Sequence, residues 1–267
     1  MEIVKKYSEQ LSAVKAALFD FDGTLSTLRY GWEKVMLPMM TEFICGKTGA
    51  CENSAINDEV AEYIDQSTGI QTIFQMEWLS ERIKTYNNLE KGPDPWELKK
   101  EYLSRLMLNV KERREDVSSG RIQASKYHVL NALPFVAGLQ KCGVKLYAAS
   151  GTDDADVKME AGLLGFAGYF GDIRGAGVHS RDCGKEAVLK ELADNLDPKT
   201  LAVFGDGKVE IKLGQQIGAR TIGVASDEAA GFGVDQMKRT RLISAGADII
   251  IGDFSEAELI YSFLGVK

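Results

Sequence analysis

Cysteine and histidine are scarce in this sequence, and neither occurs at a metal-binding spacing. The chain of 267 residues has four cysteines, none of them in a Cys-x-x-Cys pair, and two histidines. We therefore expect neither a zinc site nor a disulfide framework, but reduced thiols in a cytoplasmic protein. The N-terminal segment lacks the apolar stretch of a secretory signal, and no apolar run is long enough to cross a bilayer.

Basic residues are also fewer than acidic ones, with 32 Lys and Arg against 39 Asp and Glu. The formal net charge is −7, which argues against a nucleic-acid partner because a phosphate backbone calls for a basic protein face. Hydrophobic residues make up 45% of the chain, enough to bury a substantial core. We therefore expect neither nucleic acid nor a membrane as a partner, and the sequence leaves the oligomeric state open.

What the sequence does contain is a pair of aspartates at the end of a buried strand. Asp20 and Asp22 follow the apolar run 14–19, and the chain turns at Gly23. Ligands of open α/β sheets bind at the carboxyl ends of strands. Extended residues two apart point the same way, so both carboxylates can face one ligand. Two like charges this close require a cation or a shared proton.

Strand and helix patterns alternate in most of the chain. Strands are predicted over 14–19, 144–149, 200–204, 220–224 and 247–251, with a weaker one around 169–173. Helices are predicted between them over 134–142, 153–164, 184–195, 207–217 and 254–263. This alternation predicts an α/β fold with a doubly wound parallel sheet, a Rossmann-like core formed by residues 1–27 and 132–267.

Residues 28–131 carry helical patterns and no convincing strand, and so form a predicted helical insertion. Helices are predicted over 32–44, 52–66, 70–86 and 96–117. We expect Pro38 to kink or interrupt the first of them. The stretch Ser118-Ser119-Gly120 suits a hinge, and the insertion is predicted to act as a mobile lid on the core.

Three further features lie where a site at the top of the sheet would use them. Ser150-Gly151-Thr152 follows a strand and offers a hydroxyl and backbone N–H groups to an anion. Lys185 lies near the start of a helix, in Asp182-Cys183-Gly184-Lys185. Gly205-Asp206-Gly207-Lys208-Val209-Glu210 follows another strand, so Asp206 can converge with Asp20 on one cation.

In this order, these residues resemble the four motifs of the haloacid dehalogenase-like (HAD) hydrolase superfamily. The resemblance covers about residues 14–27 and 132–267, and the insertion matches the helical cap that one branch carries after the first motif. Glu210 stands where many relatives have Asp. The resemblance implies a phosphatase in which Asp20 is the nucleophile that forms an aspartyl-phosphate. It also implies that Asp22 first protonates the leaving oxygen and then activates water.

The resemblance further implies a cofactor and its ligands. Mg²⁺ would be held by the Asp20 side chain, the Asp22 backbone carbonyl and Asp206, in keeping with its preference for oxygen ligands. Ser150 and the backbone N–H of Gly151 would bind phosphoryl oxygens. Lys185 would supply positive charge to those oxygens. Glu210 would orient Lys185 or a metal-bound water.

The predicted function is therefore that of a magnesium-dependent phosphoric monoester hydrolase. Its expected partner is a small phosphorylated metabolite, with a sugar phosphate as the default choice. Dehalogenase relatives do not need the second aspartate that is present here, whereas sugar-phosphate mutases keep both and stay an alternative. A phospho-accepting signalling module is the alternative from another class, although such a module is about half as long. Among residues near the two crossings into the insertion, Arg29 and Lys126 are the candidates for substrate specificity.

Overall fold

A computed structural model describes residues 1–5, 7, 12–46, 54–177 and 184–266. These residues form one seven-stranded sheet in the order β1-β7-β6-β5-β2-β3-β4. All neighbouring strands are parallel except β1, which is antiparallel to β7. The strands are β1 Glu2–Ile3, β2 Ala16–Phe19, β3 Lys145–Asp153, β4 Asp172–Ala176, β5 Leu201–Gly205, β6 Arg220–Val224 and β7 Ile249–Ile251.

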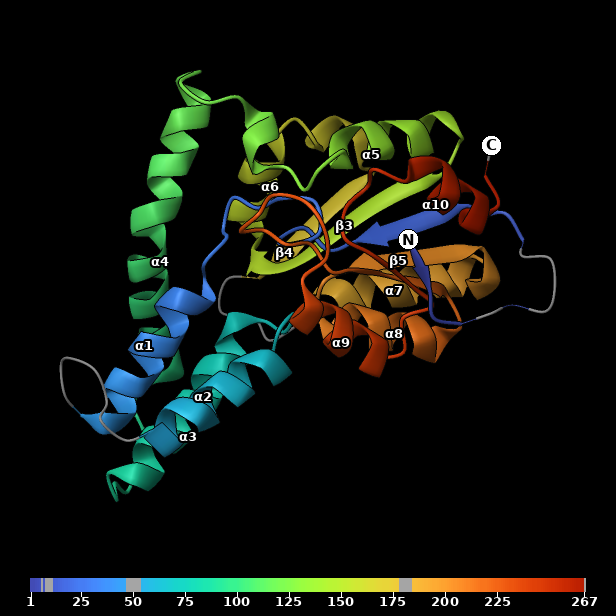
Figure 1. Ribbon diagram of the computed structural model, residues 1–267. Helices are drawn as coiled ribbons and strands as arrows, with labels where there is room; N and C mark the ends of the chain where they lie inside the picture. Colours follow the sequence, from blue (N-terminus) through green and yellow to red (C-terminus); the bar gives the residue numbers. More distant parts are fainter. Residues whose placement is uncertain (6, 8–11, 47–53, 178–183, 267) are drawn as a thin grey trace.

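Helices cover both faces of this sheet (Figure 1). One face carries α5 Ala132–Lys141, α6 Asp154–Leu163 and α10 Ala257–Leu264. The other carries α7 Gly184–Asn195, α8 Lys208–Ile217 and α9 Gln236–Ser244. Short 3₁₀ helices occur at η1 Ala124–Tyr127, η2 Ala167–Tyr169 and η3 Pro198–Thr200. The predicted doubly wound α/β fold is confirmed.

Strands β2 and β5 are apolar throughout because the sheet is covered on both faces. Every residue of β2, β5 and β6 is buried, and the rings of Phe19 and Phe204 stack with their centroids 4.3 Å apart. Since β2 lies between β5 and β3, the residues that follow these parallel strands meet at one edge of the sheet. This strand order places Asp20 between Ser150 on one side and Asp206 on the other.

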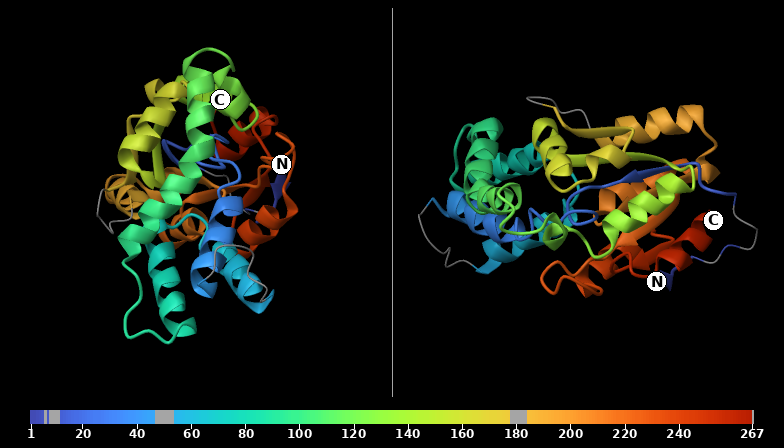
Figure 2. Two further views of the ribbon diagram at one scale, coloured as in Figure 1. Left: turned by 90° about the vertical axis from the view of Figure 1, so that its left-hand side faces the viewer. Right: turned by 90° about the horizontal axis from the view of Figure 1, so that it is seen from above.

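The insertion between β2 and α5 folds as four helices beside that edge: α1 Glu33–Cys45, α2 Ser54–Gln66, α3 Thr72–Tyr86 and α4 Pro95–Ser118. Figures 1 and 2 show them gathered at one end of the sheet, and we call them the cap. The cap has its own apolar core, which includes Met36, Met39, Val60, Leu79 and Val110. Its longest helix, α4, is capped at its N-terminus by Asp94, whose carboxylate accepts a hydrogen bond from the backbone N–H of Trp96. The domain division at residues 27/28 and 131/132 stays a prediction.

Several elements differ from the sequence prediction. β3 continues through Ser150 to Asp153, because it goes on pairing with β4 after a shift in register. The weak strand expected around 169–173 begins only at Asp172. Helix α9 and the two-residue strand β1 were not predicted. Both depend on tertiary partners: β1 pairs with β7, and α9 packs on β6 and β7.

The interruption expected at Pro38 was wrong, because α1 is continuous from Glu33 to Cys45. Pro38 lies on the exposed side of the helix. Proline has no N–H, so the backbone carbonyl one turn earlier loses its helical hydrogen bond, but on this side it can bind water instead. The buried side, with Met36, Met39 and Met40, holds the helix against the rest of the cap. Packing therefore outweighs the local preference.

The prediction of reduced thiols holds for Cys142 and is wrong for Cys45, which is disulfide-bonded. A disulfide requires proximity in space, and the spacing of cysteines along the sequence carried no signal for it. Asp182 and Cys183 of the lysine motif, and the predicted start of the second helix at 52, lie outside the described residues. None of the helices in the described part of the chain is both long and apolar enough to cross a membrane.

Candidate active site

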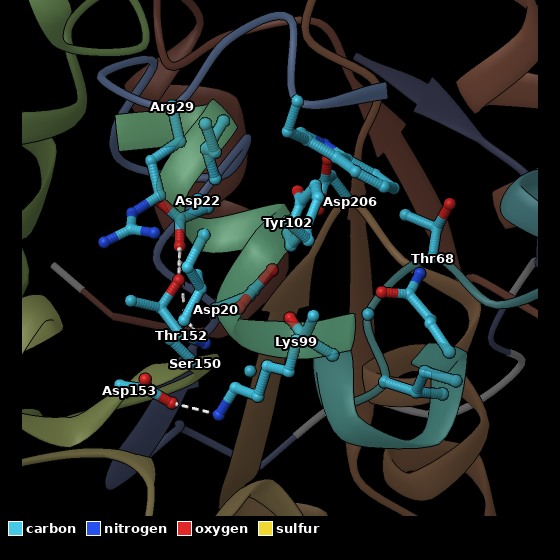
Figure 3. A pocket seen from close by; sticks show the side chains of 18 of the residues that line it. Asp20, Asp22, Arg29, Thr68, Lys99, Tyr102, Ser150, Thr152, Asp153 and Asp206 are labelled. Carbon is cyan, nitrogen blue, oxygen red and sulfur yellow. Dashed lines mark hydrogen bonds and ion pairs between the residues drawn. The ribbon is translucent and has the colours of Figure 1, made fainter. Parts of the chain in front are cut away.

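A small cavity lies between the carboxyl edge of the sheet and the cap (Figure 3). Its volume is about 100 Å³. The core wall includes Asp20, Asp22, Ser150 and Asp206, which follow or end the central strands, and Lys185 from the first turn of α7. The cap wall includes Trp32, Thr68, Gln75, Lys99 and Tyr102. The structure therefore brings together most of the side chains selected from the sequence as site residues.

Asp20 lies at the centre of the core wall and is almost fully buried. Its Oδ1 is 2.9 Å from the Nζ of Lys185, which also contacts the carboxylate of Glu210. Burial raises the pKa of Asp20 well above its usual range; Lys185 opposes this shift, and the charges of Glu210 and Asp206 add to it. Glu210 does not line the cavity, but it holds Lys185 in place from behind.

Of the two carboxylate oxygens of Asp22, one accepts hydrogen bonds and the other accepts none. Its Oδ2 accepts hydrogen bonds from the hydroxyls of Ser150, at 3.1 Å, and Thr152, at 2.9 Å. Its Oδ1 is buried and lacks a hydrogen-bond partner. Burial raises the pKa of Asp22 to about 6, although the positive charge of Arg29 opposes the shift. A carboxyl group in this state can hold a proton near neutral pH and exchange it with a ligand.

Asp206 approaches the backbone of Gly23 so closely that a Cβ at Gly23 would lie 2.1 Å from Asp206 Oδ2. Gly23 also has a φ of +75°, so the turn requires glycine for two reasons. Burial alone would raise the pKa of Asp206. The cations of Lys238 and Arg241 outweigh burial and lower that pKa, which keeps the carboxylate ionised.

The carboxylates fit a hard cation. Asp20 and Asp206 are both buried, and each raises the free energy of ionising the other, so a cation between them would relieve the repulsion. Oxygen donors of this kind suit Mg²⁺. Among the described residues, no group of three or more acidic, histidine or cysteine side chains is arranged around a metal position. The predicted ligand set needs only two side chains, because Asp22 would contribute its backbone carbonyl.

The two specificity candidates lie in different places. Arg29 lines the cavity, but its guanidinium is bound to the buried carboxylate of Glu160 at 2.9 Å and lies 4.0 Å from Asp22 Oδ1. It faces the core helix α6 and Asp22 rather than the cap wall. Lys126 lies on η1 and lines a separate, larger cavity of about 600 Å³ with Tyr30 and His128. The structure therefore does not bring Lys126 to the candidate active site.

A cap loop that contains Gly69 and Ile70 approaches the carboxyl edge of the sheet. The backbone carbonyl of Gly69 accepts a hydrogen bond from Lys185 Nζ at 3.2 Å. A Cβ on Gly151 would lie 2.8 Å from the carbonyl of Ile70, so this approach of the loop depends on a glycine at 151. The cap thus completes the surroundings of Lys185.

Next to this loop, the cap is tied to the core by ion pairs. Asp65 at the end of α2 accepts from Lys208 Nζ at 2.9 Å and from Arg241 at 3.0 Å. Burial alone would raise the pKa of Asp65, but the two cations outweigh it and lower that pKa. Arg241 also donates to the hydroxyl of Thr68 and to the backbone carbonyl of Asp206. The cap loop and the strand-end aspartate are therefore linked through one guanidinium.

Sequence reasoning missed Lys99, Glu160 and Lys238. Lys99 reaches from α4 into the cavity and pairs with Asp153 at 2.5 Å (Figure 3). Glu160 is fully buried on α6 and binds Arg29 and Arg114. The helices that carry Lys99 and Glu160 were predicted only from an amphipathic pattern, and the helix that carries Lys238 was not predicted. A charged residue on the buried side of such a helix is the one signal that could have drawn attention to them.

A covered, mostly parallel sheet with an acidic carboxyl edge and a helical cap inserted after β2 defines a capped, doubly wound α/β protein. The chain belongs to the haloacid dehalogenase-like hydrolases, whose family model matches residues 14–218. None of the curated proteins matches the sequence.

Solved structures similar to this chain agree with that family. A predicted phosphatase from Clostridium acetobutylicum is 18% identical with a TM-score of 0.63, over 94% of this chain and 100% of that one. A predicted phosphoglycolate phosphatase from Haemophilus somnus is 14% identical with a TM-score of 0.60, over 94% and 99%. A β-phosphoglucomutase from Clostridium difficile is 14% identical with a TM-score of 0.55, over 94% and 97%. At these identities the likeness shows the shared fold.

Proposed function

We propose that this protein is a magnesium-dependent phosphatase that hydrolyses a small organic phosphate monoester through an aspartyl-phosphate. The observation that carries the proposal is the buried Oδ1 of Asp22, which makes no hydrogen bond, in the same cavity as the Asp20 carboxylate. In this proposal the Asp20 carboxylate attacks and the Asp22 carboxyl group transfers a proton. Two carboxylates divided in this way can split a slow hydrolysis into two faster steps.

In the first step, an Asp20 carboxylate oxygen attacks phosphorus and the bond from phosphorus to the leaving oxygen breaks. The protonated Asp22 carboxyl gives its proton to that oxygen, so an alcohol leaves. Ser150 and the backbone N–H of Gly151 hold the phosphoryl oxygens. Lys185 offsets their negative charge, and Glu210 keeps Lys185 in position.

In the second step, water attacks the aspartyl-phosphate and the bond from phosphorus to the Asp20 oxygen breaks. Asp22, now a carboxylate, takes the proton from this water. The hydroxyl of Thr152 holds Asp22 Oδ2, so that Oδ1 stays turned to the reacting oxygen in both steps. The one hydroxyl proton of Ser150, which Asp22 Oδ2 accepts in the free protein, turns to the phosphoryl group when substrate binds. Inorganic phosphate leaves, and both aspartates return to their starting states.

A magnesium ion would be held by Asp20, Asp206 and the Asp22 backbone carbonyl. It would supply charge neutralisation between the attacking carboxylate and the phosphoryl group, since two anions must approach each other. Asp206 is kept ionised by its cationic neighbours, as a metal ligand must be.

The size of the cavity favours a small substrate. Its volume of about 100 Å³ is well below that of typical ligand pockets, which hold about 300–1,000 Å³. The leaving group would meet Lys99, Tyr102 and Gln75 on the cap wall. The fold is shared with a β-phosphoglucomutase, so a sugar-phosphate mutase is the second candidate.

A panel of phosphate monoesters tests the proposal, with Mg²⁺ present or removed by EDTA. We expect release of inorganic phosphate from small esters, only with Mg²⁺. Conversion of a sugar 1-phosphate to the 6-phosphate without release of phosphate would favour the mutase. A stable phosphoenzyme that neither releases nor transfers phosphate would favour a signalling module. Phosphate release in excess EDTA would remove the metal from the mechanism.

A further inference from the structure

Lys238 is a buried lysine that the proposed mechanism does not use. It lies on α9, a helix that the sequence analysis did not predict, and only 8% of its surface is exposed. A buried ammonium is costly unless its donors are satisfied. Its Nζ lies 2.6 Å from Glu228 Oε1, 3.3 Å from Ser226 Oγ and 3.0 Å from Asp206 Oδ2. All three N–H donors of the ammonium therefore have an acceptor.

Two of these acceptors lead to the two chain segments on either side of the candidate metal position. Asp206, which follows β5, is bound directly. Ser226 follows β6, and its hydroxyl donates to the backbone carbonyl of Gly23 at 2.6 Å. Gly23 comes directly after Asp22 in the turn that follows β2. Lys238 is thus connected to the turn of the first motif through Ser226, and to the fourth motif through Asp206.

The third acceptor, Glu228, offsets the charge that Lys238 brings. Glu228 is largely shielded from solvent, lies in the same loop as Ser226, and has its Oε1 2.6 Å from Lys238 Nζ. Burial raises the pKa of Glu228, and the charge of Lys238 opposes this shift. Without an acid beside it, a second cation next to Asp206 would oppose the binding of a metal ion. The pair of Lys238 and Glu228 can therefore fix the orientation of the Asp206 carboxylate without adding a full positive charge at the site.

We propose that Lys238 is a positioning residue of the candidate magnesium site, which sets the separation of the Asp206 carboxylate from the Asp22–Gly23 backbone through Ser226. The proposal rests on the magnesium site of the proposed function and adds to it. Groups that orient metal ligands affect affinity strongly, and their loss costs about 10–100-fold in metal binding. No step of the reaction passes through Lys238.

The test is magnesium binding measured by isothermal titration calorimetry without substrate, so the readout does not depend on turnover. Lys238→Met alone would remove a positive charge near the metal position. The reduced repulsion of Mg²⁺ could then hide the effect of a less well oriented Asp206 carboxylate. The double variant Lys238→Met/Glu228→Gln removes one charge of each sign. We expect it to bind Mg²⁺ about tenfold or more weakly than the wild type. Its thermal unfolding in EDTA shows whether it is folded.

Ser226→Ala is the second variant, because it removes a single hydroxyl and keeps every charge. We expect a smaller loss of magnesium affinity in the same direction, and this variant carries the test if the double variant does not fold. The matched control is Arg239→Met/Glu2→Gln. It removes an ion pair from the same helix, where Arg239 contacts Glu2 at 2.6 Å, and should bind Mg²⁺ like the wild type.

Wild-type affinity in both folded test variants would overturn the positioning role. An equal loss in the control would also overturn it, because the effect would then follow from weakening α9. A wild-type protein that binds no Mg²⁺ would contradict the metal in the proposed function and this proposal with it. Magnesium binding without phosphatase activity, lost on removal of Lys238, would contradict the activity alone and support the positioning role.

Discussion

The core wall and the cap wall of the cavity are built from different side chains. The core wall carries the buried Asp20 and Asp206 and the partly buried Asp22. These carboxylates lie near Lys185, Lys238 and Arg29. The cap wall carries hydroxyl, amide and aromatic groups, with Lys99 as its cation among the lining residues that the structure describes. Lys99 is itself paired with a core residue, Asp153. Charge is thus concentrated where the sheet ends and is sparse on the helical side.

From this difference we expect the core wall to act on the phosphoryl group and the cap wall to contact the leaving group. The aspartates of the core wall sit at the ends of buried strands, whose rigid packing fixes them relative to one another. Side-chain ion pairs are among the contacts that attach the cap to the core, and we predict that they can open without disturbing the sheet. We therefore expect substitutions in the core wall to affect every substrate, and substitutions in the cap wall to depend on the leaving group.

The largest effect is expected for Asp20→Asn. The amide keeps the shape of the side chain but can neither attack phosphorus nor serve as an anionic ligand. Turnover should fall by about 10⁴-fold or more for every ester tested, as it does when nucleophiles of covalent enzymes are removed. Steady-state phosphate release measures this, with circular dichroism as the control for folding. Substantial residual turnover in folded protein would contradict the covalent mechanism.

Asp22→Ala should cause the next largest loss of turnover, and the size of the loss should depend on the leaving group. General acid–base catalysis contributes about 10²–10⁴-fold. An alkyl phosphate, whose leaving oxygen needs a proton, should lose most of that factor in the phosphorylation step. An aryl phosphate should lose much less, and phosphoenzyme should then accumulate because water also lacks its base. Single-turnover kinetics with both esters measure this, and equal losses without a burst would argue against the role of Asp22.

Lys99→Met tests the cap wall. Removing the cation should lower kcat/KM for the preferred small ester by about tenfold, the value of one hydrogen bond to a charged group. A generic aryl ester should change much less. Lys100→Met is the matched control, since its exposed side chain lies on the same helix and pairs with Glu97 at 3.8 Å. Lys126→Ala, whose residue lines the other cavity, should leave both esters unchanged. Equal losses on both esters would mean that Lys99 serves the fold.

Asp65→Asn should have the smallest effect. It weakens the ion pairs that hold the cap loop over the core, and partly exposed pairs of this kind contribute about 0–1 kcal/mol each. We expect a rise in KM of a few-fold and faster proteolysis within the cap in the absence of substrate. Asp58→Asn, an exposed residue on the same helix, is the control. If the two variants behave alike, the pairs of Asp65 do not hold the cap closed.

The sequence by itself determined the doubly wound core, the helical insertion and the principal side chains of the core wall. It could do so because these features are local: a buried apolar strand, a turn at glycine and an acid at the strand end occur within a few residues of one another. Asp20, Ser150 and Asp206 were predicted to converge because parallel strands present their carboxyl ends at one edge. The structure confirms the fold, and the catalytic roles of these residues stay predictions.

Only the tertiary structure decided what surrounds those residues. Arg29 looked like a specificity residue from its place after the first motif, but the structure pairs it with Glu160, 131 positions away. Lys126 lies near the return crossing in the chain and yet lines another cavity. Lys238 joins two motif segments from a helix that gave no signal of its own. Such contacts depend on how the helices and strands pack together. They cannot be predicted from spacing along the chain, because the residues involved are far apart in the sequence and meet only after folding.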